Sequence, residues 1–374
     1  MATTTTPAAT TTTTTTAAAP ATVDEQRAAR FRPSPAGWVG RGAVLAALAA
    51  VVLIVPALRD PSDVRLFAQA VIYAVIGLSL NVLLGYTGQI SLGHQAFVGV
   101  GAFTSAYMVT VQAQPFFLAV LVAMIVGAVQ AAILGGVSLR IRGLYFALIT
   151  LSFGIVAEES LFAIESLTGG GAGQPAPLPA GFSTPYRYYY LCLAVLAVVL
   201  WVDYRMMKSK GGRALLALRE NPRVAATFGI DVRLFTMFSF VVAGVFAALG
   251  GALLAHNSEI VVASVFDFRL ALVFVIMTVV GGLRSRTGVV IGSAFFALLG
   301  YLIEVLHVEG ALKAIPFAPD LSKELAPLVL GPVLLLLTLT LYPGGIGQQV
   351  LPIQRWLRGE RFDLSNRGEK EVQV

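Results

Sequence analysis

Charge is scarce in this chain of 374 residues, and its scarcity excludes several classes of protein. Charged residues make up 12% of the sequence and hydrophobic residues 57%, whereas a soluble domain carries about twice that charge. The composition therefore excludes an ordinary soluble enzyme and a nucleic-acid-binding protein. The single cysteine, Cys192, cannot form an intrachain disulfide, which excludes a disulfide scaffold.

Residues suited to catalysis, metal binding or nucleotide binding are also few. The three histidines are scattered, and no second histidine or cysteine lies three or four residues from His94 or His256. No G-x-x-x-x-G-K-[ST] loop occurs to hold the phosphates of ATP. We therefore predict no catalytic residue, no metal site and no cofactor bound by this chain. Energy for any transport must then come from a partner or from an ion gradient.

Long apolar runs dominate the sequence instead. A bilayer core about 30 Å thick needs roughly 20 apolar residues per helix. The runs are continuous rather than alternating, which argues against a membrane β-barrel. We predict an all-α polytopic integral membrane protein with about ten transmembrane helices, at residues 42–58, 66–84, 91–111, 116–137, 143–164, 186–204, 234–256, 268–283, 288–306 and 326–342.

The distribution of basic residues predicts the orientation of these helices. If each run spans once, twenty of the 26 Lys and Arg residues fall on one side. The positive-inside rule makes that side cytoplasmic and places both termini there. We divide the chain into a disordered Thr/Ala/Pro-rich cytoplasmic tail at 1–40, a transmembrane domain at 41–348 and a cytoplasmic tail at 349–374. The longest basic loop of the transmembrane domain is 205–233.

The stretch 85-GYTGQISLGHQAFVGVGAF-103 is unusually rich in glycine and neutral polar residues. Glycine at this density allows a helix to break or backbones to approach closely. Unwound backbone at membrane depth survives only where it is buried in protein or lines a cavity, and transporters build substrate sites from such breaks. The alternative is a short cytoplasmic turn followed by a helix face of small residues.

Two carboxylates, Glu158 and Glu159, lie well inside an apolar run. An ionisable group at membrane depth costs several kcal/mol unless it faces a cavity or a partner. Glu158 is therefore a candidate pathway residue. The alternative is that this helix ends early and leaves both carboxylates at the outer interface.

The basic segment 205–233 contains two short amphipathic helices, which we predict at 213–221 and 222–230. Asn221-Pro222 separates them, because proline disfavours helix at the residue before it. Two such helices between two spans form a docking element for a partner protein. The alternative is an interfacial loop held to anionic membrane lipid by its basic residues.

Several collinear motifs together resemble the permease subunits of the branched-chain amino acid ABC importers, specifically the longer of the two homologous permeases. They cover nearly the whole membrane part and read 77-GLSLNVLLGYTGQISLGHQAF-97, 142-RGLYFALITLSFG-154, 167-LTGGGAGQ-174, 212-GRALLALRENPRVAATFGIDV-232, 279-VVGGLRSRTGVVIGSAF-295 and 342-YPGGIGQ-348. The pattern also covers urea and short-amide permeases.

The resemblance implies partners and residue roles. Such a subunit pairs with a second homologous permease, two ABC ATPase subunits that use ATP and Mg²⁺, and an extracytoplasmic solute-binding protein, in the bacterial plasma (inner) membrane. It implies that the loop at 212–229 couples to an ATPase through Gly212, Arg213, Arg219, Glu220, Asn221, Ala225, Ala226 and Gly229. We assign Asn81, Gln89, Ser91, Gly93, His94 and Glu158 to the substrate pathway.

The expected function is ATP-driven import of branched-chain or other neutral amino acids. Import of urea or short amides is the main alternative. An ion-coupled secondary transporter fits the spans less well, because it would normally place carboxylates at the membrane midplane. A membrane enzyme would need clustered His, Asp or Glu residues, which the sequence lacks.

Overall fold

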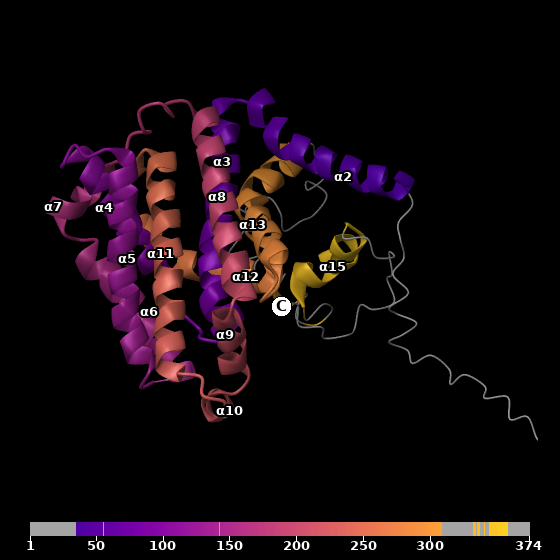
Figure 1. The fold of residues 1–374 in the computed structure, drawn as a ribbon. Coiled ribbons are helices and arrows are strands. Elements are labelled where there is room, and N and C mark those ends of the chain that lie inside the picture. The colour runs from indigo at the N-terminus through magenta and orange to yellow at the C-terminus, as the bar shows by residue number, and fades with distance from the viewer. Residues whose placement is uncertain are drawn as a thin grey trace, which may run out of the picture.

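A computed structural model describes residues 35–54, 56–141, 143–308, 332–333, 335–336, 340 and 344–357. Nearly all described elements are helices (Figure 1). The α-helices are α2 (Pro35–Ile54), α3 (Pro61–Leu80), α4 (His94–Thr110), α5 (Phe116–Ser138), α6 (Leu144–Val156), α7 (Glu165–Thr168), α8 (Pro185–Lys208), α9 (Lys210–Glu220), α10 (Pro222–Thr227), α11 (Val232–Ser258), α12 (Phe268–Gly281), α13 (Arg286–Val308) and α15 (Gly345–Leu357).

The remaining elements are short. Two π-helices continue α3 and α6, and one two-stranded antiparallel sheet pairs Gln174 with Val261 and Pro175 with Ile260. These elements are η1 (Pro56–Leu58), η2 (Asn81–Thr87), η3 (Ala157–Leu161), η4 (Gly170–Ala172), η5 (Ala263–Phe266), β1 (Gln174–Pro175) and β2 (Ile260–Val261).

The helices are those of an all-α membrane protein. Five helical segments are long and apolar enough to cross a bilayer: Pro61–Thr87, Phe116–Ser138, Leu144–Leu161, Pro185–Lys208 and Val232–Ser258. Shorter apolar helices lie at Arg41–Ile54, Phe268–Gly281 and Arg286–Leu302. The predicted runs from 42–58 to 288–306 each overlap a described helix, whereas most of the tenth, 326–342, lies outside the described residues.

The predicted tails also lie largely outside the described residues, apart from their ends nearest the membrane domain. Helix α2 begins at Pro35, before the predicted start of the membrane domain at residue 41. Helix α15 covers the beginning of the predicted C-terminal tail. Helix therefore runs across both predicted boundaries of the membrane domain.

Helix α11 forms the centre of the bundle and packs against α3, α4 and α5. Small residues make these contacts close: a Cβ atom added to Gly251 would lie 1.9 Å from the Val98 carbonyl oxygen of α4. Close approach of small residues is the usual basis of helix packing in membranes, where lipid is as apolar as the side chains. The core is thus set by backbone proximity as well as by apolar volume.

The two ends of the bundle differ. Helices α9 and α10 lie at one end of the bundle, where they connect the end of α8 to the start of α11, and we call this the α9 end (Figure 1). The opposite end carries α7 and the β1–β2 sheet. There an ion pair between Arg65 Nη2 of α3 and Glu259 Oε1, the residue after α11, joins the two helices at 2.7 Å.

His256 near this opposite end is a buried packing residue. Its Nδ1 lies 2.7 Å from the Pro177 carbonyl oxygen and its Nε2 lies 3.0 Å from Ser105 Oγ. Both ring nitrogens are therefore already engaged within the protein. Over the part of the chain that the structure describes, no group of three His, Cys, Asp or Glu residues is placed to hold a metal ion.

Candidate functional site

The glycine-rich stretch begins in η2, the π-helix that continues α3, and then forms a turn in which only Ser91 and Gly93 are buried. We call α3 together with η2 the interrupted helix, because its α-helical pattern ends at Leu80. Helix α3 continues as the π-helix η2 to Thr87, and Gly88 ends it in the left-handed conformation, with a φ of 71°. A turn at 88–93 then leads into α4. Ser91 and Gly93 are buried in this turn, whereas Gln89 is half-buried. The turn lies at the α9 end, because η2 packs against α9.

Helix α6 closes over this turn. A Cβ atom on Gly93 would lie 1.9 Å from the Thr150 carbonyl oxygen, so only glycine allows α6 to come this close. The Leu92 N–H donates to Thr150 Oγ1 at 3.0 Å. The 142-RGLYFALITLSFG-154 motif and the glycine-rich stretch therefore meet in space.

The start of α4 gathers buried, neutral polar groups. His94 Nε2 lies 2.6 Å from Ser79 Oγ of α3, and both side chains are fully buried. Ser91 Oγ, His94 Nδ1 and the side-chain amide of Gln95 have no hydrogen-bond partner among the described residues. Such groups normally bind water or a solute when they are buried. Ser79 and Gln95 were missed by the sequence interpretation, because neutral polar residues in a helix leave no distinctive pattern.

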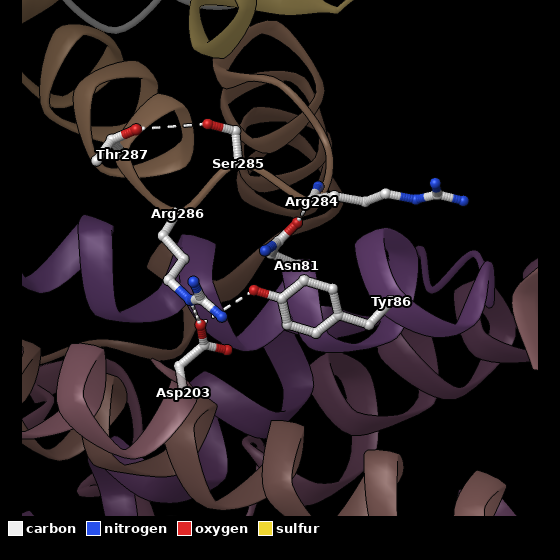
Figure 2. Close-up of polar contacts among 7 residues, drawn as sticks. All are labelled: Asn81, Tyr86, Asp203, Arg284, Ser285, Arg286 and Thr287. Carbon is white, nitrogen blue, oxygen red and sulfur yellow. Dashed lines mark hydrogen bonds and ion pairs between the residues drawn. The ribbon is translucent and has the colours of Figure 1, made fainter. Parts of the chain in front are cut away.

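Asn81 links the interrupted helix to the turn between α12 and α13. Its Oδ1 accepts a hydrogen bond from the Arg284 N–H at 3.0 Å (Figure 2). Arg284 is one of three non-glycine residues with positive φ among those described, at 70°. The Asn81 side chain therefore caps a strained backbone position in another part of the chain, and it is fully buried.

A charged cluster lies beside Asn81. Asp203 Oδ2 of α8 accepts hydrogen bonds from the Tyr86 hydroxyl at 3.0 Å and from Arg286 Nε of α13 (Figure 2). The Asp203 carboxylate is fully buried. The sequence interpretation missed this role, because Asp203 falls at the end of a predicted run, 186–204, whereas α8 continues to Lys208.

Glu158 lies apart from the other predicted pathway residues. It is on η3, half-buried, one turn beyond the Gly154 that contacts Gln95, in the direction of α7. Helix continues past it to Leu161, so the carboxylate is part of the helical segment Leu144–Leu161. No hydrogen bond between described residues joins Glu158 to Asn81, Ser91 or His94.

A cavity of about 300 Å³ lies between α4, α5 and the segment after α6. Phe103, Tyr107, Leu161 and Phe162 form much of its apolar lining. None of the predicted pathway residues lines this cavity.

The segment after α8 forms a helical hairpin, α9 and α10, which we call the α9–α10 hairpin (residues 210–227). Ser209 Oγ caps α9 at the Gly212 N–H, and Asn221 Oδ1 caps α10 at the Arg223 and Val224 N–H groups. Gly212, Leu215, Leu218 and Ala225 are buried. The predicted coupling residues that face outward are Arg213, Glu220, Asn221, Ala226 and Gly229.

Two apolar side chains are exposed at the α10 end of the hairpin, Val224 within α10 and Phe228 directly after it, and we call these two residues the tip of the hairpin. Phe228 is 82% exposed and Val224 is 49% exposed. Both residues lie outside the five helical segments that are long and apolar enough to cross a bilayer. The sequence interpretation missed Phe228, because an aromatic residue there is equally compatible with burial.

Arg219 and Glu220, at the end of α9, contact the membrane part. Arg219 Nη1 donates to the carbonyl oxygens of Leu84, at 3.0 Å, and Gly85 of η2. Glu220 Oε1 accepts from Arg284 Nη2 at 2.5 Å. Burial lowers the pKa of Arg219, although an arginine starts far above neutral pH and stays charged. The hydrogen bond and the charge of Arg284 lower the pKa of Glu220.

Two further glycine motifs meet at the α9 end. Gly345, with a φ of 66°, would bring a Cβ atom within 2.7 Å of Gly282 Cα. The turn at 282–285 and the residues before α15 are therefore in backbone contact. This contact explains why 279-VVGGLRSRTG-288 and 342-YPGGIGQ-348 both need glycine.

Fold and site together define a polytopic α-helical membrane protein with an interrupted helix and a helical hairpin at one end. The chain belongs to the family described as the permease component of branched-chain amino acid transport systems, whose model matches residues 64–338.

Three curated relatives illustrate the family. The chain is 27% identical over 277 residues to the high-affinity branched-chain amino acid transport permease LivM of Escherichia coli, covering 67% of this chain and 65% of that one. The same protein of Salmonella typhimurium is 27% identical over 282 residues, covering 68% and 66%. The galactose/methyl galactoside import permease MglC of Salmonella typhimurium is 25% identical over 295 residues, covering 71% and 84%.

The chain thus spans slightly less than two thirds of the length of the two LivM proteins. No solved structure matches it.

Proposed function

We propose that this protein is the transmembrane permease subunit of an ATP-driven importer for branched-chain or other neutral amino acids. The family and the LivM relatives support this proposal. The observation that carries it is the α9–α10 hairpin, which offers Phe228 and Val224 outward while Arg219 contacts the interrupted helix. The hairpin thus presents apolar side chains to solvent and at the same time contacts the membrane part.

The proposed topology has ten spans with both termini in the cytoplasm. The α9 end is then cytoplasmic, in the bacterial plasma membrane. The basic residues of α8, α9 and the α12–α13 turn support this orientation, since Arg205, Lys208, Arg213, Arg284 and Arg286 all belong to that end. In this scheme 1–40 and 349–374 are cytoplasmic tails, and 41–348 is the permease domain.

The proposed partners are two ABC ATPase subunits, a second homologous permease and an extracytoplasmic solute-binding protein, within membrane lipid. The ATPases would bind ATP and Mg²⁺, and one of them would receive the tip of the hairpin in an apolar groove. Phe228 suits such a groove, because aromatic anchors dominate the binding energy of many interfaces. Gly212 and Ala225 would hold the hairpin in shape, and Arg213, Glu220, Asn221, Ala226 and Gly229 would surround the anchor.

The proposed substrate carries no net charge. The groups near the start of α4 are neutral, and they come from Ser79, Ser91, His94 and Gln95. The charged Asp203 is occupied by Tyr86 and Arg286. Asn81, Gln89 and Gly93 would shape the cytoplasmic mouth of the pathway, and Glu158 would lie nearer the outer end.

Reconstitution tests this function. The complex of this chain with the permease, ATPase and binding protein encoded beside it should take up radiolabelled leucine into proteoliposomes only when ATP is present. Urea and galactose should be taken up far less; preferential uptake of either would overturn the amino-acid assignment. Leucine uptake by this chain without ATPases, driven by a proton gradient, would overturn the ABC assignment in favour of a secondary transporter.

A further inference from the structure

Arg219 occupies an unusual position for a residue of a docking helix. It is half-buried at the inner side of α9, and its Nη1 donates to two successive carbonyl oxygens, those of Leu84 and Gly85. These carbonyls belong to the last turn of the 27-residue span Pro61–Thr87. The last carbonyls of a helix lack helical partners, and a cationic side chain is one of the groups that satisfies them.

The chain beyond these carbonyls leaves the helix immediately. The Gly88 N–H closes η2 by donating to the Leu83 carbonyl oxygen, and Gly88 adopts the left-handed conformation. A Cβ atom at Gly88 would lie 3.3 Å from Arg219 Cγ, so the aliphatic stem of Arg219 lies against the turn itself. Arg219 thus contacts both the end of the helix and the start of the turn at 88–93.

A second contact closes a ring of three elements. Glu220, the next residue of α9, pairs with Arg284 in the α12–α13 turn at 2.5 Å. The Arg284 N–H in turn donates to Asn81 of η2 at 3.0 Å. Helix α9 is therefore tied to η2 directly through Arg219 and indirectly through Glu220.

The two contacts differ in how firmly they are held. Glu220 is 70% exposed, so water competes for its ion pair with Arg284. Arg219 is half-buried and bonded to backbone, which cannot rotate away as a side chain can. By contrast, α8, η2 and α13 are joined by the buried Asp203, Tyr86 and Arg286 cluster, which does not include α9 (Figure 2).

We propose that Arg219 is the positioning residue through which movement of the α9–α10 hairpin reaches the interrupted helix and opens or closes the turn at 88–93. This inference rests on the proposed function, because it needs an ATPase to move the hairpin. The Asp203 cluster ties η2 to α8 and α13 at Tyr86, whereas Arg219 ties α9 to η2 and to the turn that follows it. The turn carries buried Ser91 and leads to His94, so a change there alters access to the neutral polar groups of α4.

The test compares Arg219→Ala with Lys210→Ala in the complete complex with its ATPases. Lys210 is an exposed cation of the same helix and serves as the matched control. Ile90→Cys, at a residue that is 40% exposed in the turn, reports access through its rate of thiol labelling. The native Cys192 is buried, which keeps the background low.

In the otherwise unchanged chain, and with Lys210→Ala, ATP should change the labelling rate of Ile90→Cys at least threefold. With Arg219→Ala the ATPases should remain bound and hydrolyse ATP, but the labelling rate should no longer respond. The ATP consumed per leucine imported should rise at least tenfold. The inference would be overturned if Arg219→Ala left both the ATP-dependent change in labelling rate and the ATP consumed per leucine imported unchanged. The proposed function would then remain intact.

Arg219→Lys keeps the charge but loses the planar fork, and it serves if Arg219→Ala fails to assemble. Its labelling response should fall between those of the unchanged chain and zero, and a full response would overturn the inference. If the unchanged chain bound no ATPase subunit, the proposed function would be overturned, and this inference with it. The labelling measurement needs no substrate, so it remains decisive whichever solute is imported.

Discussion

At the scale of single residues, Asp203 is the charge on which the α9 end most depends. Its carboxylate is fully buried and pairs with Arg286, whose side chain is 26% exposed. Removing one partner of a buried pair leaves the other charge without compensation, which costs about 3 kcal/mol or more. The pair between Arg65 and Glu259 is much more exposed, and exposed pairs contribute about 1 kcal/mol or less.

Asp203→Asn should therefore lower the thermal stability of the purified protein far more than Glu259→Gln. Both substitutions replace a carboxylate by the isosteric amide, so they differ mainly in the burial of the lost ion pair. The measurement is the unfolding midpoint in one detergent, followed by tryptophan fluorescence. Equal shifts for the two variants would show that the Asp203 cluster contributes little to stability.

Glu220 predicts a dependence on pH. Arg284 lowers the pKa of Glu220 in the folded protein, so the pair contributes stability above the usual glutamate pKa of about 4.3. That contribution is lost as the pH falls through the lowered value. Limited proteolysis of the α9–α10 hairpin should therefore be constant from pH 7 to pH 5 and accelerate only in stronger acid. Glu220→Gln should cleave at the faster rate at every pH; a rate that still slows as the pH rises would contradict this assignment.

At the scale of elements, the packing of α11 against α4 depends on the absence of side chains. Gly251→Ala would place a Cβ atom 1.9 Å from the Val98 carbonyl oxygen and force the two helices apart. Overpacking of this kind costs about 1–3 kcal/mol. Gly136 of α5 has nothing within 4 Å of an added Cβ atom. Alanine there should be neutral or stabilising by up to about 1 kcal/mol, because alanine favours helix.

Unfolding midpoints of Gly251→Ala and Gly136→Ala test this difference with the same chemical change in two helices. The unfolding midpoint of Gly251→Ala should fall, and that of Gly136→Ala should stay the same or rise. A Gly251→Ala variant as stable as the unchanged protein would mean that α11 and α4 are not in backbone contact.

The sequence predicted most elements because apolar runs and proline positions are local signals. Asn221-Pro222 predicted a break between two short helices at 213–221 and 222–230. Helices α9 and α10 overlap these ranges, but α9 begins earlier, at Lys210, and α10 ends earlier, at Thr227. The end of α3 was predicted at residue 84, whereas helix continues to Thr87 as a π-helix. Arg219 and Arg284, which are distant in the chain, contact this extension of the helix. A local sequence pattern cannot predict contacts of this kind.

At the scale of the whole molecule, the candidate site is assembled from segments far apart in the chain. Asn81, Asp203, Arg219 and Arg284 come from three helices and a turn that meet at the α9 end. Figure 2 shows Asn81, Asp203 and Arg284 of this group. The sequence analysis assigned Asn81 to the substrate pathway and Arg219 to the ATPase-coupling loop but did not predict their partners, because pairing over such separations depends on the fold. Glu158 makes no hydrogen bond to these residues in the part of the chain that the structure describes, so its role in the pathway stays a prediction.

The central claim is that the hairpin is the element that receives the ATPase. Disulfide cross-linking measures this directly: Phe228→Cys, with Cys192 replaced by alanine, is combined with single cysteines along the surface groove of the ATPase. Ile260→Cys is the control, because it is 53% exposed in β2 at the opposite end of the bundle. The account predicts cross-links to the ATPase from position 228 and none from position 260. An intact complex that cross-links from position 260, or that fails to cross-link from position 228 at every groove cysteine, would contradict it.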